Sequence, residues 1–203
     1  MQKAVIYIHG KGGTAKEAEH YKPIFKGLDV IGFDYKAQNP WEAAEEFQSF
    51  FDSVSKKYLS VSVIANSIGA FFTMSALSDR RIERAMFISP IVNMEKLICD
   101  MLLWANVSEK ELCEKKEIKT AFGETLSWKY LCYVREHPVR WTAPTEILYG
   151  ANDRLTAYDT VLNFSKETGA ALTVMENGEH WFHTDGQMRF LDNWICRFAE
   201  HDS

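Results

Sequence analysis

The sequence lacks long hydrophobic segments and any excess of basic residues. Its first apolar run, from Ala4 to Ile8, is too short for the core of a signal peptide or for a membrane span. We therefore expect a cytoplasmic protein with no membrane partner. Lysine and arginine number 23 against 28 acidic residues, which gives a formal net charge of -5. No basic run interleaved with aromatic residues occurs, so a nucleic-acid partner is not expected.

Cysteine is scarce, and so are the residues that make linkers. None of the cysteines has the short paired spacing of a zinc site or a disulfide framework, so we expect reduced thiols with packing roles. The four are Cys99, Cys113, Cys132 and Cys196. Repeats, low-complexity tracts and linkers rich in proline, glycine or serine are also missing. The 203 residues, 46% of them hydrophobic, fit one domain with a full core, and no signal indicates an oligomeric state.

Short runs rich in valine, isoleucine and aromatic residues predict six strands. They are Ala4–Ile8, Val30–Tyr35, Val61–Ala65, Arg84–Ser89, Thr145–Tyr149 and Ala171–Met175. Their apolar character is nearly continuous, which is typical of strands buried on both faces of a parallel sheet. Apolar residues at helical spacing follow Pro40 and recur from Phe190 to Phe198. Alternating strands and helices predict a doubly wound α/β fold, with catalytic residues beyond the carboxyl ends of the strands.

The segment from Ile91 to Thr142 interrupts this alternation. It contains no convincing strand, and it predicts helices from Met94 to Trp104, from Glu109 to Ala121 and from Leu126 to Glu136. It is also dense in large aromatic residues: Trp104, Phe122, Trp128, Tyr130, Tyr133 and Trp141. Two interpretations are open. The helices either cover the core or form a cap over a substrate pocket.

A serine stands at a predicted turn between a strand and a helix. Ala65-Asn66-Ser67-Ile68-Gly69 directly follows a buried strand and precedes an apolar helical run. Such a turn raises the serine oxygen above the sheet, and it needs small residues two before and two after because the strand and helix backbones pass close together. Ala65 departs from the usual glycine by one methyl group. The alternative is a serine that only caps the helix.

The first predicted strand ends in a glycine-rich loop, His9-Gly10-Lys11-Gly12-Gly13-Thr14. Glycines allow backbone N–H groups to point toward a developing oxyanion, which is a major source of stabilisation in acyl transfer. The loop could instead bind phosphate at a helix N-terminus. However, it matches neither a Walker loop nor the dinucleotide-binding fingerprint.

A carboxylate and an imidazole follow the last two predicted strands. Asp153 comes just after the strand that ends at Tyr149, and His180 comes just after the strand that ends at Met175. Each alone would be an ordinary loop residue. Together with the glycine-rich loop and Ser67, they give four features in the order oxyanion loop, serine, acid and histidine, each at the carboxyl end of a strand.

These residues resemble the α/β-hydrolase superfamily over essentially the whole chain. His9-Gly10 matches the opening of the oxyanion loop, Ser67 the nucleophile, Asp153 the acid and His180 the base. The chain starts at what would be the family's third strand, so the resemblance implies a sheet without the two antiparallel N-terminal strands. It also implies that the first strand is central beside the nucleophile strand, and that helical caps follow Ser89-Pro90, which favours a cap over residues 91–142.

The resemblance implies a serine esterase or thioesterase that acts on a small-molecule acyl substrate without a metal or organic cofactor. His180 would take the proton of Ser67, and Asp153 would orient His180. Backbone N–H groups of Ile68 and of Lys11 or Gly12 would form the oxyanion hole. A module that binds a ligand or a partner protein, with little turnover, is the alternative.

Rival residues exist for the acid and for the base. Asp159 falls in a predicted helix and Asp185 comes later in the last loop, so Asp153 is preferred. His183 precedes Thr184-Asp185, either of which would cap the last helix. The positive end of a helix disfavours the imidazolium that a base must become. We therefore predict His180 as the base.

Overall fold

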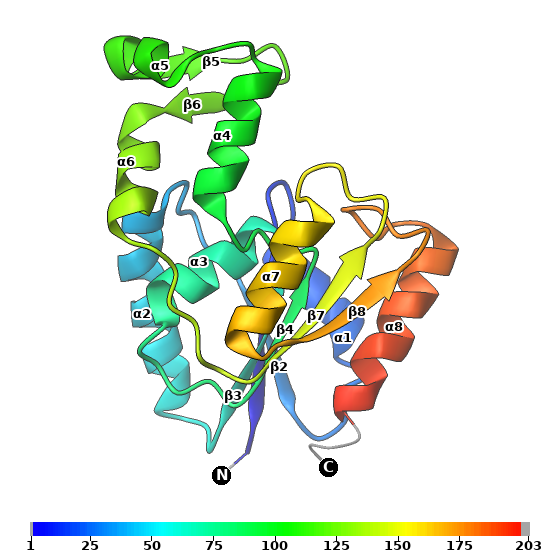
Figure 1. Ribbon diagram of the computed structural model, residues 1–203. Helices are drawn as coiled ribbons and strands as arrows, with labels where there is room; N and C mark the ends of the chain where they lie inside the picture. The colour runs from blue at the N-terminus through cyan, green and yellow to red at the C-terminus, as the bar shows by residue number, and fades with distance from the viewer. Residues whose placement is uncertain (1, 200–203) are drawn as a thin grey trace. The chain divides into compact units, whose positions relative to one another are not determined.

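The apolar runs form one parallel sheet in the computed structural model, which describes residues 2–199. The strand order is β2-β1-β3-β4-β7-β8, and every pairing in this sheet is parallel (Figure 1). The strands are β1 (Ala4–Ile8), β2 (Asp29–Phe33), β3 (Val61–Asn66), β4 (Ala85–Ile88), β7 (Thr145–Gly150) and β8 (Ala171–Met175). The predicted doubly wound, six-stranded α/β fold is therefore confirmed, with strand ends shifted by at most two residues.

The strand order reverses between β1 and β3. The chain runs from β1 outward to β2, returns to the other side of β1 as β3, and then continues outward through β4, β7 and β8. Ile8 pairs with Ala65, so the carboxyl ends of β1 and β3 lie at the same height. In open α/β sheets, such a switch point leaves a crevice beyond the strand ends where ligands bind.

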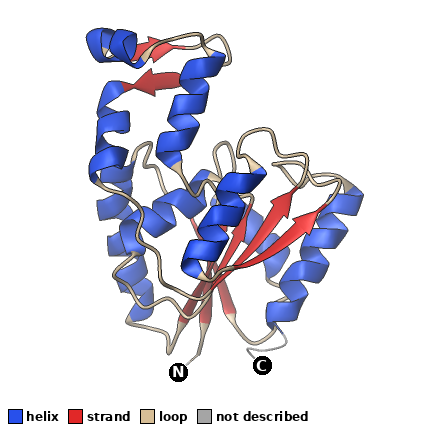
Figure 2. Ribbon diagram, in the orientation of Figure 1, coloured by secondary structure: helices blue, strands red, loops and turns tan. Residues whose placement is uncertain are grey.

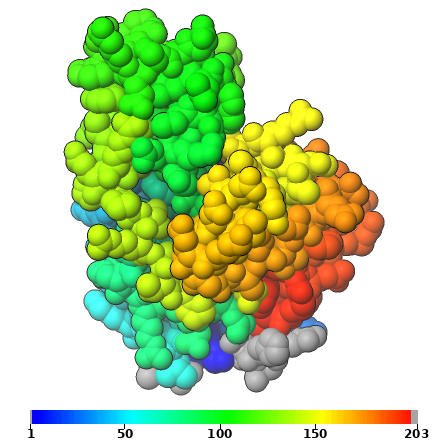
Figure 3. Space-filling model, in the orientation of Figure 1, coloured from blue at the N-terminus to red at the C-terminus, as the bar shows by residue number. Residues whose placement is uncertain are grey.

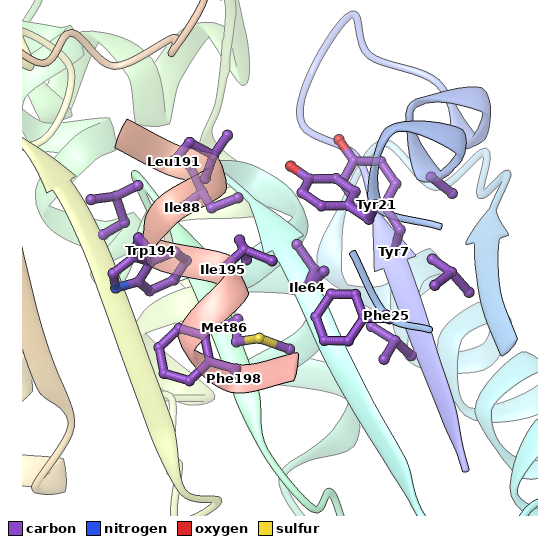
Figure 4. Close-up of a cluster of buried hydrophobic side chains, with 14 of the residues drawn as sticks. Tyr7, Tyr21, Phe25, Ile64, Met86, Ile88, Leu191, Trp194, Ile195 and Phe198 are labelled. Atoms are coloured by element: carbon purple, nitrogen blue, oxygen red, sulfur yellow. The ribbon is translucent and has the colours of Figure 1, made fainter. Parts of the chain in front are cut away.

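Helices cover both faces of the sheet because the strands bury side chains on both (Figure 2). On one face, α1 (Ala18–Tyr21) and α8 (Asp185–Ala199) pack over a cluster that includes Tyr7, Ile64 and Trp194 (Figure 4). On the other face lie α2 (Pro40–Ser55) and α3 (Ile68–Leu77), where the aromatic rings of Phe47 and Phe72 are 6.0 Å apart.

Two further elements complete this part of the chain. The short 3-10 helix η1 (Ala15–Glu17) precedes α1, and α7 (Tyr158–Thr168) connects β7 to β8. Side chains of α7, in gold, lie on the surface seen in Figure 3. Within residues 2–199, no helix combines the length and the hydrophobicity needed to cross a bilayer. All four cysteines are free and partly buried.

The chain divides into two compact units, with boundaries after Val92 and after Val139. We call the part built on the parallel sheet the sheet unit, and Asn93–Val139 the helical unit. The helical unit contains α4 (Met94–Trp104), α5 (Glu109–Lys115) and α6 (Trp128–Glu136). It also contains a two-stranded antiparallel sheet of β5 (Glu117–Lys119) and β6 (Thr125–Ser127).

This small sheet corrects three predictions. The segment does contain strands, and the helix expected from Glu109 to Ala121 ends at Lys115. Lys116 has a φ of 67°, which ends the helix, and Gly123 has a φ of 89° in the turn between the strands. Each strand has three residues, too few for an alternating pattern to be recognised. The helix predicted from Leu126, which is α6, begins at Trp128 instead, because Leu126 pairs in β6.

Trp141 also differs from its predicted place. It belongs to the sheet unit rather than to the aromatic set of the helical unit. Its side chain is buried, its ring centroid lies 5.6 Å from that of Phe87, and its indole N–H donates to Thr145 Oγ1 at 2.7 Å. Trp141 is therefore a core residue of the sheet unit, in which a buried indole has found its polar partner.

Candidate active site

Ser67 stands alone between β3 and α3 in a strained backbone conformation. Its φ is 50° and its ψ is -118°, outside the regions that residues with a side chain favour. Backbone hydrogen bonds hold it there: Ser67 N–H donates to Ile88 O at 3.0 Å, and Ser67 O accepts from Ile91 N–H at 3.2 Å. The conformation projects the side chain at the strand-to-helix turn, as the sequence pattern predicts.

Small residues around Ser67 are required by close backbone approach. A Cβ atom on Gly69 would lie 2.5 Å from His9 O, closer than real atoms come. One on Gly10 would lie 3.3 Å from the Cβ of Ser67. Ala65 is completely buried, so the methyl group that departs from the usual pattern fits within the core. The glycine-rich loop and the serine turn therefore pack directly against each other.

The three predicted polar residues form one hydrogen-bonded series. Ser67 Oγ lies 2.8 Å from His180 Nε2, and His180 Nδ1 lies 2.7 Å from Asp153 Oδ2. An ionised carboxylate can only accept, so Nδ1 donates to Asp153 and Nε2 is left to accept the serine proton. The Asp153 side chain is 0% exposed and that of His180 is 24% exposed. The acid is thus shielded from water while the histidine ring stays accessible.

The buried carboxylate of Asp153 is held by its own loop. Its second oxygen, Oδ1, accepts the N–H groups of Leu155 at 2.7 Å and Thr156 at 3.0 Å. The Tyr149 hydroxyl donates to Thr156 O at 2.7 Å, which anchors the far side of the loop. These bonds offset part of the cost of burying a charge, and they leave Oδ2 directed at the histidine.

The loops that carry the acid and the base are tied to each other. Asn152 N–H donates to Gly178 O at 2.8 Å, and a Cβ atom on Gly150 would lie 2.5 Å from the Gly178 backbone. Both positions therefore require glycine. Gly150 ends β7 and Gly178 comes three residues after β8, and a glycine in such a position can indicate close backbone approach.

The rival residues lie elsewhere. His183 Nδ1 bonds to Trp181 O at 2.7 Å, its ring stacks on that of Trp181, and its side chain is 42% exposed. Asp159 lies in the first turn of α7, and Asp185 is the first residue of α8 rather than part of the loop. The structure brings Ser67 together with His180 and Asp153 instead.

The predicted oxyanion residues lie on the adjacent loop and helix. Gly13 N–H donates to Gly10 O at 3.1 Å, closing a turn in which Gly12 has a φ of 77°. Lys11 and Gly12 are exposed in that turn. Ile68 is the first residue of α3, where helix N–H groups lack partners within the helix. Among residues 2–199, no three acidic, histidine or cysteine side chains are grouped to hold a metal ion.

Comparison with solved structures identifies the fold. The chain is similar to Est1E from Butyrivibrio proteoclasticus, with a TM-score of 0.78 and 18% identity over 99% of this chain and 88% of that one. Alpha/beta hydrolase domain-containing protein 10 from mouse gives a TM-score of 0.78 and 16% identity over 98% of this chain and 90% of that one. At such identities, the likeness establishes the fold.

Comparison of sequences gives one curated relative. It is a Mycoplasma genitalium protein named "Putative esterase/lipase 3", 24% identical over 142 residues that cover 64% of this chain and 50% of that protein. The chain thus spans about half the length of the curated relative it matches. No family model matches the sequence.

Proposed function

We propose that this chain, which has the α/β-hydrolase fold, is a serine hydrolase that cleaves a carboxylic ester or thioester through an acyl-enzyme intermediate. One observation carries the proposal: Ser67 Oγ, His180 and Asp153 form an uninterrupted hydrogen-bonded series at the strand ends. The similarity in fold to an alpha/beta hydrolase domain-containing protein and in sequence to a protein named as an esterase or lipase supports the same reaction class.

The first half of the reaction is nucleophilic attack. Ser67 Oγ attacks the acyl carbonyl carbon while His180 Nε2 takes its proton over the 2.8 Å contact. Asp153 Oδ2, 2.7 Å from Nδ1, fixes the ring orientation and stabilises the imidazolium. The leaving alcohol or thiol receives the proton from His180 as the carbon–oxygen or carbon–sulfur bond breaks. The acyl group is then an ester of Ser67.

Charge on the carbonyl oxygen needs donors on the side facing Ser67. The N–H of Ile68, at the positive end of α3, is the first proposed donor. The second comes from the turn that follows β1, from Lys11 or Gly12, where the glycine allows the N–H to point toward the serine. Donors fixed in place before the reaction act without reorganisation, which makes them effective in such sites.

The second half of the reaction uses water. His180 removes a proton from a water molecule that attacks the acyl-serine, and it then returns that proton to Ser67 Oγ as the carboxylic acid leaves. The proposed chemistry uses only these side chains and backbone groups, with no metal or organic cofactor. We propose a small-molecule acyl substrate. Est1E has been solved with ferulic acid bound, so aromatic acyl esters belong in a substrate panel.

A fluorophosphonate probe tests the proposal. Such probes label a serine that a neighbouring base has activated, so we expect Ser67 of the wild-type protein to be labelled and the Ser67→Ala variant to be unlabelled. A wild-type protein that stays unlabelled would contradict the proposal and would favour the module that binds a ligand or partner. The cap over residues 91–142 and the cytoplasmic location stay predictions.

A further inference from the structure

A buried tyrosine lies directly behind the nucleophile turn. Tyr7, in β1, is 1% exposed, and its hydroxyl accepts a hydrogen bond from Asn66 Nδ2 at 2.7 Å. Asn66 immediately precedes Ser67 in the chain. The same hydroxyl also contacts the Glu17 carboxylate through Oε2. A change in the position of Tyr7 is therefore transmitted to the residue that begins the strained turn.

Glu17 connects this tyrosine to the glycine-rich loop. Its other carboxylate oxygen, Oε1, accepts the N–H of Thr14 at 2.9 Å. Thr14 is the last residue of that loop. A Cβ atom on Gly13 would lie 2.8 Å from Glu17 Oε1. A side chain at position 13 would therefore displace the Glu17 carboxylate from its place against the loop backbone.

The direction of each hydrogen bond in this series is determined by chemistry. An ionised carboxylate only accepts, so the Tyr7 hydroxyl donates to Glu17 and its oxygen receives the N–H of Asn66. Burial, with the Tyr21 phenol and the Glu17 carboxylate nearby, raises the pKa of Tyr7 well above its usual value. The phenol therefore stays protonated and keeps its role as donor. With Glu17 accepting, the hydrogen bonds run from Asn66 to Tyr7 and from Tyr7 to Glu17, and Thr14 also donates to Glu17.

We infer that Glu17 and Tyr7 are positioning residues, which hold the oxyanion loop Gly10–Thr14 in register with the Ser67 turn. The inference rests on the proposed function. Its physical basis is that Lys11 and Gly12 are exposed at the tip of the loop, so the position of this tip depends on the residues that anchor the loop on either side of it. Donors to an oxyanion must be held within a few tenths of an ångström, which requires such a support.

A purely stabilising role predicts a different result from a positioning role. If the series only strengthens the fold, its loss lowers the melting temperature and leaves turnover unchanged. If it positions the loop, its loss lowers kcat and the rate of Ser67 labelling, while KM stays close to the wild-type value. Loss of correct geometry without loss of any reacting group costs up to about 100-fold in rate.

The test compares two glutamates of the same segment. Glu17→Ala removes both hydrogen bonds, whereas Glu19→Ala removes an exposed carboxylate whose partner is Lys22. Each variant is assayed with a p-nitrophenyl acetate substrate, with the fluorophosphonate probe and by thermal unfolding. We expect Glu17→Ala to lower kcat and the labelling rate by about 10- to 100-fold with KM little changed, and Glu19→Ala to match the wild type.

Two further variants sharpen the result. Glu17→Gln keeps one oxygen acceptor and the side-chain shape, so its kcat should lie between those of Glu17→Ala and the wild type. Tyr7→Phe should lower kcat, and combining it with Glu17→Ala should cost less than the product of the two separate losses, because both act through one series. Glu17 is exposed, so its variants should fold even if Tyr7→Phe does not.

The outcomes separate this inference from the proposed function. A wild-type protein that is labelled, beside a Glu17→Ala variant with unchanged kcat and labelling rate, would overturn the inference alone. So would equal losses in Glu17→Ala and Glu19→Ala. A wild-type protein that is not labelled would overturn the proposed function, and the inference with it.

Discussion

The sheet unit and the helical unit differ in the interactions that stabilise each of them. The sheet unit buries many of its largest side chains completely, among them Trp194, Tyr7 and Phe47, although Trp181 is 74% exposed. In the helical unit the buried side chains include aliphatic residues such as Leu112 and Leu131, while Trp104 is 51% exposed. Its Arg135 pairs on the surface with two carboxylates, those of Glu95 and Glu109. Surface pairs of this kind contribute about 0 to 1 kcal/mol each.

This contrast indicates which tasks each unit can perform. A side chain at the end of a fully buried strand has few alternative positions, so the sheet unit can hold reacting atoms at fixed distances. A unit with a small core and exposed aromatic rings offers apolar contact but less fixed geometry. We therefore expect chemistry to depend on the sheet unit. If the cap predicted for residues 91–142 is correct, substrate preference should depend on the helical unit. The following variants are ordered by the size of their expected effect on activity.

The largest losses should follow removal of the nucleophile or base. Ser67→Ala should lower esterase kcat by about four to six orders of magnitude, and His180→Ala should cause a comparable loss, because these residues act as a unit. The melting temperature of Ser67→Ala should barely change. His183→Ala is the matched control and should keep a substantial fraction of activity. Turnover retained by Ser67→Ala, or the reverse pattern in the two histidines, would contradict the assignment.

Asp153→Asn should cost about 10⁴ in kcat at neutral pH, by analogy with the same change in serine proteases. The asparagine Oδ1 can still accept the N–H groups of Leu155 and Thr156, so the loop should fold normally. Its amide N–H₂ would then face His180 and favour the wrong tautomer. Steady-state kinetics beside a thermal melt check both statements. Near-normal turnover in Asp153→Asn, with a loss in Asp159→Asn, would show that the acid is misassigned.

Exposed aromatic residues of the helical unit test whether this unit affects substrate preference. If they contact the acyl chain, Trp104→Ala and Phe122→Ala should each lower kcat/KM for long acyl esters by about 10- to 150-fold relative to acetate esters, since burying one such ring contributes roughly 1.5–3 kcal/mol. Leu59→Ala, which removes another exposed apolar side chain from the sheet unit, is the control. Equal effects on all chain lengths, or none, would contradict a role in substrate preference.

High pH should destabilise the sheet unit without affecting activity at neutral pH. Burial raises the pKa of four of its tyrosines above the usual value of 10.0, in the case of Tyr149 to about 12. The four are Tyr7, Tyr21, Tyr35 and Tyr149. Folding favours their neutral form, so this stabilisation is complete below pH 10 and is lost as the pH rises through the folded-state pKa values.

Unfolding by urea at a series of pH values, together with the absorbance of phenolate, measures this effect. We expect the free energy of unfolding to fall above about pH 10, with delayed ionisation of the buried tyrosines. Ionisation of all eight tyrosines in a single step near pH 10.0, with no change in stability, would contradict it.

The sequence predicted the secondary structure of the sheet unit better than that of the helical unit. Continuous apolar runs predicted the sheet, because a strand such as β1, buried on both faces, leaves little choice of residue. The sequence also singled out Ser67, Asp153 and His180, since each lies within five residues of the carboxyl end of a strand. In the helical unit, β5 and β6 were missed because three-residue strands carry too little pattern.

Contacts between distant side chains could not be predicted. Tyr7 was predicted only as part of an apolar strand. Its hydroxyl bonds to Asn66, which lies 59 residues away in the sequence, so the sequence pattern could not predict this contact. Glu17 was assigned no function, because an exposed glutamate in a helical stretch is usually a solvated side chain. Trp141 was placed in the wrong unit because an aromatic residue in a loop carries no sign of the strand against which it packs.

The distance along the chain between Ser67 and its base bears on folding. The two residues are separated by 113 positions, and Asp153 follows the helical unit. A nascent chain that has completed β1 to β4 possesses the serine turn but neither the acid nor the base. Contacts of such high sequence separation form late, after the cost of closing a long loop has been met. The serine should therefore gain its reactivity only when β7 and β8 have joined the sheet, so labelling of Ser67 during refolding would time the last step of assembly.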